Sequence, residues 1–179
     1  MMNSIYLDNA ATTAIDPEVI AVMHASMQDT FGNPSSTHQF GRKAKSAVET
    51  ARKNIANHFN ITPSEIVFTA GGTEADNLII HNAVVHLGVQ RIITAKTEHH
   101  AVLHTVEHFQ RLGLITADYV KVDAFGSVDT PHLEALLTSS DQKTLVSLMY
   151  INNEVGTILP VEEVSLICKK YAALFHSDT

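Results

Sequence analysis

The distribution of apolar and polar positions predicts two amphipathic helices near the start of the chain. The longer one runs from about Phe40 to Phe59, where apolar residues recur at helical spacing and basic side chains occupy the remaining face. The shorter one reaches from Pro17 to Met27, because Asp16 is a typical N-cap and proline is favoured at the first helical position. The small polar residues of Asp8–Thr13 are expected to form a loop before it.

From residue 66 onward, short apolar runs alternate with helical patterns. Strands are expected at Ile66–Phe68, Arg91–Thr94, Ala117–Val122, Thr144–Met149 and Leu174–Asp178, and helices at Leu78–Leu87, His100–Leu112, Thr130–Leu137 and Val161–Ala173. Strands that alternate with helices form a largely parallel sheet covered by helices on both faces. The predicted fold class is therefore a three-layer α/β unit with a mostly parallel sheet.

Composition and charge narrow the class of protein. The 179 residues are 45% apolar, which is enough for a buried core and is read most simply as one domain of ordinary soluble type. The formal charge of −7 argues against nucleic acid as a partner, because phosphate backbones are bound by basic surfaces. No apolar run approaches the roughly 18 residues of a membrane span and no targeting pattern is present, so we expect a cytoplasmic protein without a membrane partner.

The single cysteine, Cys168, fits a reducing compartment. It lies among apolar residues at helical spacing, which predicts a buried core thiol rather than a nucleophile.

Polar residues that follow the predicted strands are the candidates for a binding site. They are Thr69–Thr73, Thr97–His100, Asn152–Glu154 and Asp178. In parallel α/β sheets, ligands bind beyond the carboxyl ends of the strands, so these residues are expected to converge on one crevice.

The Gly71–Gly72 turn that opens the helix before Leu87 has the features of a phosphate site. The first N–H groups of a helix have no internal partner and lie at the positive end of its dipole, while glycines allow a ligand to approach closely. An ordinary turn is the alternative, because the stretch is neither a Walker A loop nor a G-x-G-x-x-G motif.

The other candidates also have structural alternatives. His99 and His100 lie where a strand gives way to a helix, and each is either a cap or a ligand-binding group. The series from His100 to His108 extends over about 12 Å, too far for one ion, so we expect no metal site. Asn152–Gly156 is either a polar turn or a source of amides for a bound ring, and Asp178 either binds a cationic ligand atom or belongs to a frayed terminus.

Taken together, these motifs resemble one family. The matching stretches are Tyr6–Thr13, Gly32–His38, Glu49–Arg52, Thr69–Asn77, Thr97–Val102, Asn152–Gly156 and His176–Asp178. They resemble the pyridoxal-phosphate-dependent cysteine desulfurases of the nitrogenase and iron–sulfur-cluster type, within the class V aminotransferases. The resemblance implies an incomplete large domain of the fold type I transferases, with residues 1–15 contributing to the active-site pocket and residues 16–179 forming the N-terminal part of the cofactor-binding domain.

The resemblance also implies roles for individual residues. Gly72 and Thr73 would bind the phosphate of pyridoxal 5′-phosphate, and His99 would stack on its ring. Asn153 would bond the phenolic oxygen, and Asp178 would pair with the protonated ring nitrogen. The substrate pocket would include the N-terminal loop residues Asn9, Ala10, Ala11 and Thr12.

The activity implied for the intact protein is that of a homodimeric sulfurtransferase. It converts L-cysteine to L-alanine and passes the sulfur as a persulfide to acceptor and scaffold proteins for iron–sulfur cluster and thio-cofactor assembly. In the family, the Schiff-base lysine and the persulfide cysteine follow the residue matched by Asp178, so no catalytic residue is assigned here and the 179 residues alone are expected to be inactive. The alternatives are another class V activity, such as selenocysteine lyase, and a non-catalytic binding or dimerising module.

Overall fold

The computed structural model of the protein describes residues 5–179. The chain divides into two compact units, unit 1 up to Phe68 and unit 2 from Thr69 to Thr179. This division differs from the single domain expected from length and apolar content. Within unit 1, the first helix buries none of its side chains.

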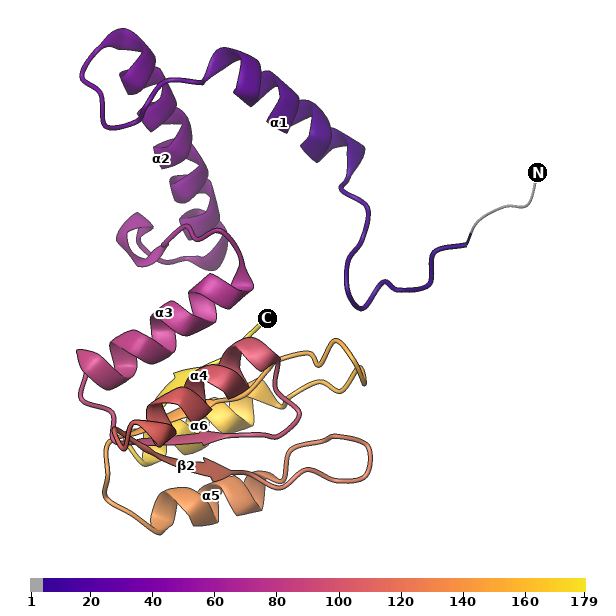
Figure 1. Ribbon diagram of the computed structural model, residues 1–179, viewed down its shortest axis with the longest axis vertical. Coiled ribbons are helices and arrows are strands. Elements are labelled where there is room, and N and C mark those ends of the chain that lie inside the picture. The colour runs from indigo at the N-terminus through magenta and orange to yellow at the C-terminus, as the bar shows by residue number, and fades with distance from the viewer. Residues whose placement is uncertain (1–4) are drawn as a thin grey trace. The chain divides into compact units, whose positions relative to one another are not determined.

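Unit 1 consists of helix α1 (Pro17–Asp29), helix α2 (Gln39–Phe59) and the 3₁₀ turn η1 (Pro63–Glu65) (Figure 1). The predicted cap of α1 is confirmed, because the Asp16 carboxylate accepts a hydrogen bond of 2.7 Å from the backbone N–H of Glu18. Helix α2 begins where the imidazole of His38 accepts from the Gly41 N–H, and it ends at Asn60 in the left-handed conformation.

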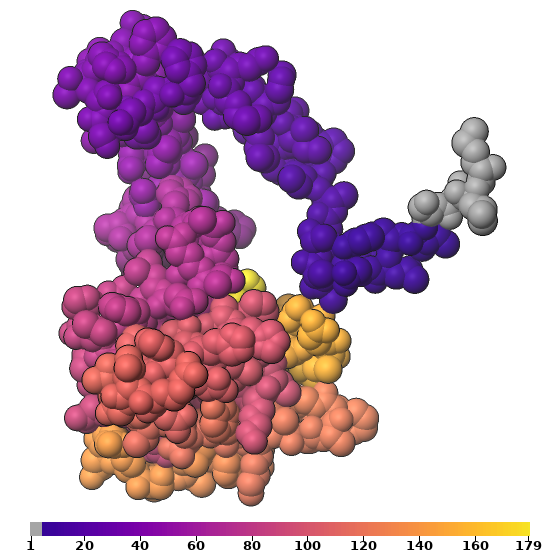
Figure 2. All heavy atoms as spheres, in the orientation of Figure 1, coloured from indigo at the N-terminus to yellow at the C-terminus, as the bar shows by residue number. Residues whose placement is uncertain are grey.

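Unit 2 is the α/β part of the chain. Its elements are α3 (Gly72–Val85), β1 (Arg91–Thr94), α4 (His100–Arg111), β2 (Thr116–Tyr119), α5 (Thr130–Thr138), β3 (Thr144–Ser147), α6 (Val161–Lys170) and β4 (Leu174–His176). The four strands form one parallel sheet in the order β2-β1-β3-β4. Figure 2 shows the atoms of this unit, coloured magenta to yellow, as a closely packed mass.

The two faces of the sheet are covered by different helices, which confirms the three-layer α/β fold. Ile92 and Leu145 belong to a core cluster with the buried side chains of α3 and α4. Their neighbours Ile93 and Val146 point the other way and pack with α5 and α6. The alternation follows from the period of two along each strand, and burial on both faces explains why β1 and β3 are buried throughout.

One predicted strand is absent and several predicted boundaries are wrong. The strands expected to reach Val122, Met149 and Asp178 end at Tyr119, Ser147 and His176. Residues Ile66–Phe68 form no strand, because among the described residues they pair with no neighbouring strand, and Val67 is 67% exposed. Helix α6 ends at Lys170 and not near Ala173, because Ala172 adopts a left-handed conformation (φ 52°) that turns the chain into β4. No helix within residues 5–179 combines the length and apolar character needed to cross a membrane.

Candidate functional site

A cavity of about 330 Å³ opens in unit 2. It is lined by Gly72, Thr73, Asp76, His99, Met149, Ile151, Asn153, Asp178 and Thr179. All five residues predicted for the cofactor site are therefore brought together, and they come from α3, from the start of α4, from the loop after β3 and from the end of β4. The position agrees with the rule that parallel α/β sheets bind ligands beyond the carboxyl ends of their strands.

The N-terminus of α3 presents free donors to this cavity. Gly71 is the N-cap and no side chain caps the helix. Among the described residues, the backbone N–H groups of Gly72, Thr73 and Glu74 have no protein acceptor, as expected for a first helical turn. Atoms placed at the β-carbon positions of Gly71 and Gly72 would meet nothing within 4 Å, so the approach to these donors is open. The arrangement suits an anion.

His99 is held by the helix that it caps. Its Nδ1 accepts a hydrogen bond of 3.1 Å from the backbone N–H of Ala101, the second residue of α4. Because Nδ1 accepts, the proton of the neutral ring lies on Nε2. The cap therefore fixes the ring at the edge of the cavity. The capping role of His99 is confirmed, and its role as a ligand-binding group stays a prediction.

The loop after β3 combines a structural asparagine with one that lines the cavity. The side-chain oxygen Oδ1 of Asn152 accepts from the backbone N–H groups of Glu154 and Val155, and its side-chain amide Nδ2 donates to the Thr97 carbonyl at 2.7 Å. Gly156 is left-handed, with φ 76°. Asn152 thus builds the turn and joins it to the loop before α4, whereas Asn153 lines the cavity.

Asp178 does not belong to a frayed terminus. The backbone carbonyl of Asp178 accepts a hydrogen bond of 2.9 Å from Tyr150, and the Ser177 hydroxyl donates to Leu148 at 2.8 Å. These bonds continue the pairing of β4 with the segment after β3, so the carboxylate of Asp178 is carried to the cavity by ordered backbone.

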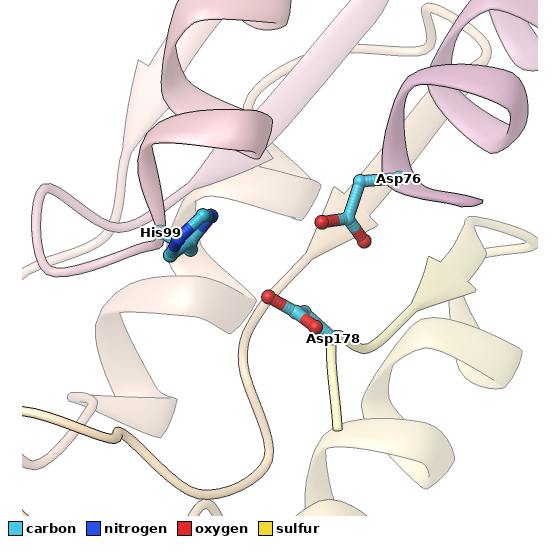
Figure 3. A group of neighbouring side chains, drawn as sticks. All are labelled: Asp76, His99 and Asp178. Atoms are coloured by element: carbon cyan, nitrogen blue, oxygen red, sulfur yellow. The ribbon is translucent and has the colours of Figure 1, made fainter. Parts of the chain in front are cut away.

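Asp76 is a member of the site that sequence reasoning missed. Figure 3 shows its carboxylate and that of Asp178 facing the same space as the imidazole of His99. One oxygen of each carboxylate and one imidazole nitrogen lie within 4.8 Å of one another. Burial and the nearby charge of Asp178 raise the pKa of Asp76 to about 6. A donor set of this spacing suits a cationic partner.

Glu98 belongs to the stretch Thr97–His100 that was expected at the crevice, but no role was predicted for this residue. It is 8% exposed, and its Oε1 accepts a hydrogen bond of 2.9 Å from the backbone N–H of Met149, which lines the cavity. The other oxygen, Oε2, is buried without a protein partner in the described part of the chain. Burial is the main cause that raises the pKa of Glu98 to about 7. A smaller cavity of about 20 Å³, enough for one water molecule, lies beside it.

The remaining predicted residues lie elsewhere. Asn9–Thr12 form an exposed turn in unit 1, and their role in a substrate pocket stays a prediction. Cys168 is 1% exposed within the core, and burial raises the pKa of its thiol to about 11, so the prediction of an inert core thiol is confirmed. Lys169 and Lys170 are exposed on α6, and Lys170 pairs with Glu134 at 2.7 Å.

Comparison with known proteins gives a consistent answer. The aminotransferase class-V family model matches residues 5–179. A cysteine desulfurase IscS of Dictyoglomus turgidum is 42% identical over 99% of this chain, and an IscS-like cysteine desulfurase of Mycobacterium tuberculosis is 43% identical over 97%. In both cases the match covers 45% of the relative, so the chain spans about half the length of the curated relatives it matches.

Solved structures show the same likeness. A NifS-like protein superposes with a TM-score of 0.85 at 39% identity, covering 96% of this chain and 47% of that one. A structure described as SspA in complex with cysteine gives a TM-score of 0.88 at 31% identity, covering 97% of this chain and 50% of that one. The ordered series of motifs, the parallel sheet and these matches agree, and the chain belongs to the class V aminotransferase family.

Proposed function

We propose that this chain forms the pyridoxal 5′-phosphate pocket of a cysteine desulfurase. The observation that carries the proposal is the convergence of Gly72, Thr73, His99, Asn153 and Asp178 on one cavity. It is supported by the relatives, which are named cysteine desulfurases. The roles of the five residues toward the cofactor are part of the proposal.

The residues present fit this cofactor. Pyridoxal phosphate has an anionic phosphate at one end of a flat ring and a basic ring nitrogen at the other. The open, uncapped start of α3 offers backbone donors and the Thr73 hydroxyl for the phosphate. The carboxylate of Asp178 suits a protonated ring nitrogen, and His99 at the edge of the same cavity offers a flat surface for stacking.

When bound, the cofactor supplies an electron sink for the α-carbon of an amino acid. The contribution of this chain is to bind and orient the ring. Asp178 holds a proton at the ring nitrogen, and this charge makes the ring a better electron acceptor. Thr73 and the N–H groups of α3 hold the phosphate, and Asn153 bonds the phenolic oxygen.

The reaction at the amino group and at the sulfur atom of a cysteine substrate requires a lysine and a cysteine. No lysine lines the cavity among the described residues, and the cysteine is buried in the core. In the whole protein we assign these roles to the lysine and cysteine that follow in the family. L-Cysteine as substrate, sulfur-acceptor proteins and a homodimer are the corresponding proposals for that protein.

The first test is a titration of the chain with pyridoxal phosphate, followed by borohydride reduction and mass spectrometry. We expect reversible binding without a labelled lysine at a defined site. Asp178→Asn should weaken binding about tenfold or more, because it removes the charge that faces the ring nitrogen. Asp141→Asn removes an exposed carboxylate from a loop away from the cavity and serves as the matched control. Equal affinities for wild type and Asp178→Asn would contradict the proposed pocket.

The second test addresses the activity. A protein that joins this chain to the half of the fold carrying the lysine and cysteine should release alanine from cysteine. Activity confined to selenocysteine would identify a lyase instead, and the absence of turnover with either amino acid would favour a non-catalytic module.

A further inference from the structure

Asp76 occupies a position where the pattern of α3 calls for an apolar side chain. The buried residues of this helix are Asp76, Ile80, Ala83 and Val84, which is the i, i+4, i+7, i+8 stripe that faces the sheet. Asp76 is only 4% exposed. A carboxyl group in such a stripe is costly unless it is paired, so its partners indicate why it is there.

On its buried side, Asp76 meets a short chain of polar groups. Its Oδ1 lies 3.4 Å from Nε2 of His176, and Nδ1 of the same ring lies 2.9 Å from the hydroxyl of Ser147. His176 is 8% exposed and Ser147 is fully buried. If the Ser147 hydroxyl donates to Nδ1, the neutral ring of His176 carries its proton on Nε2, and this N–H lies in electrostatic contact with the Asp76 carboxyl.

On its cavity side, Asp76 faces Asp178 (Figure 3). The charged or titratable groups around the two carboxyls are His99 at the start of α4, His176 on β4 and Glu98 in the loop before α4. No lysine or arginine lines the cavity among the described residues. Two carboxylates at this spacing cannot both be ionised without strong repulsion.

We propose that Asp76 and Asp178 share one proton, and that Asp76 is the positioning residue of Asp178. Below about pH 6, Asp76, which contacts His176, keeps the proton and donates it as a hydrogen bond to Asp178. The accepting carboxylate of Asp178 remains aimed into the cavity. The raised pKa of Asp76, caused by burial and by the Asp178 charge, is consistent with this division.

The pair has a use in the proposed cofactor pocket, and to that extent this inference rests on the proposed function. A lone carboxylate at the end of a strand can rotate away from its partner, whereas one that accepts a hydrogen bond from a buried neighbour is fixed. Asp76 thus acts on a ring nitrogen through Asp178 without touching it.

The decisive experiment uses the chain without cofactor, in the presence of a chelator. Carboxyl carbons of Asp76 and Asp178 are followed by NMR from pH 3 to 9 in wild type and in Asp178→Asn. We expect the Asp76 midpoint to fall by about one unit in the variant, because groups that share a proton titrate as a coupled pair. An unchanged midpoint would overturn the inference. Ring nitrogen shifts of His176 should show Nε2–H, and the opposite tautomer would also overturn it.

A second measurement separates positioning from mere support of the fold. Asp76→Ala should weaken pyridoxal phosphate binding about 10- to 100-fold, the equivalent of one hydrogen bond to a charged group. Asp76→Asn, whose amide can accept from His176 and donate to Asp178, should recover most of that loss. The 1-deaza analogue, which lacks the ring nitrogen, should be nearly indifferent to both changes. Equal losses for cofactor and analogue would make Asp76 a structural residue only.

The two proposals fail in different ways. If the wild-type chain does not bind pyridoxal phosphate, the proposed function falls. The NMR titration contains no cofactor and still decides whether the two aspartates form a pair.

Discussion

At the scale of single residues, buried polar groups gather at the carboxyl ends of the sheet. Asp76, Glu98, Asn152 and His176 are each less than 10% exposed and lie in or beside the residues that form the cavity. Burying such groups lowers stability, and two of them have strongly raised pKa values. Groups of this kind cluster at functional sites more often than at random, which supports the assignment of the cavity.

The pKa of Glu98 makes stability depend on pH. The folded chain holds this proton up to about pH 7, whereas the unfolded chain releases it near pH 4.5, so the folded state binds more protons between these values. The contribution of Glu98 to stability is therefore full below pH 4.5 and is lost as the pH rises through 7. Glu98→Gln should abolish this contribution, which has an upper limit of about 3 kcal/mol.

The measurement is urea unfolding of wild type and variant at pH 4.5 and pH 8. The amide introduced by Glu98→Gln does not titrate, so its own effect on the free energy of unfolding is the same at both pH values. The quantity compared between wild type and variant is therefore the difference in the free energy of unfolding between pH 4.5 and pH 8. Glu107→Gln removes an exposed carboxylate from α4 and should keep the wild-type pH dependence. Parallel pH profiles for wild type and Glu98→Gln would contradict the prediction.

The convergence of Thr73, His99 and Asp178 on one cavity could be predicted because polar residues follow the apolar runs of the sequence. The roles of these residues toward a cofactor come from the family resemblance and stay a proposal. Asp76 was missed, and Glu98 was given no role, for a physical reason. Asp76 follows a polar, glycine-rich turn and is expected in an exposed first turn, and Glu98 is expected in a loop. The spacing from Asp76 to Ile80 and Val84 is a signal that could have placed Asp76 on the buried stripe. The orphaned oxygen of Glu98 depends on tertiary packing that no local pattern contains.

At the scale of elements, the start of α3 allows a test that separates folding from binding. Gly72 lies in the first turn and a methyl group there would meet no protein atom within 4 Å. Gly72→Ala should therefore leave the free energy of unfolding unchanged or raise it by about 0.5–1 kcal/mol, since alanine is the better helix former. The same methyl group would be added to the lining of the cavity, where the phosphate is proposed to bind.

We accordingly expect Gly72→Ala to weaken binding of pyridoxal phosphate without destabilising the chain. Gly88→Ala provides the opposite control, because Gly88 has φ 69° and alanine is strained there although it also meets no neighbour. Calorimetric unfolding and a binding titration measure both quantities. Undiminished affinity in Gly72→Ala would place the phosphate elsewhere.

Most elements of unit 2 were predictable because periodicity and caps agree. Asp129 illustrates this, since its carboxylate accepts from the His132 N–H and caps α5, whose second residue is Pro131. The errors occur where tertiary context decides. Ile66–Phe68 has the composition of a strand but no partner strand among the described residues, and the end of α6 depends on the left-handed conformation of Ala172.

At the scale of the whole molecule, unit 1 exposes apolar side chains that its helical pattern had marked for burial. On α1, Val22 is 69% exposed and Met27 is 68% exposed. Within the described sheet, β2 and β4 are the edge strands. Surfaces of this kind promote association, so the chain should self-associate as its concentration rises.

Light scattering over a range of concentrations tests this prediction. The double variant Val22→Gln and Met27→Gln keeps good helix formers on α1 and should shift association to higher concentration, because each side chain contributes up to about 1.5–3 kcal/mol when buried. Glu18→Gln on the same helix should change little. A chain that stays monomeric at every concentration would contradict the prediction.

The cavity is assembled from the start of α3, the start of α4, the loop after β3 and the end of β4, so it exists only when unit 2 is folded. Any ligand that occupies it therefore couples its own concentration to folding: at 100 times its dissociation constant, a ligand adds about 2.7 kcal/mol to the free energy of unfolding. Thermal unfolding in increasing pyridoxal phosphate should show a rising midpoint for wild type and a smaller rise for Asp178→Asn. The concentration of ligand then determines the fraction of chains that are unfolded and accessible to proteases, so chains with an occupied pocket are degraded more slowly than empty ones.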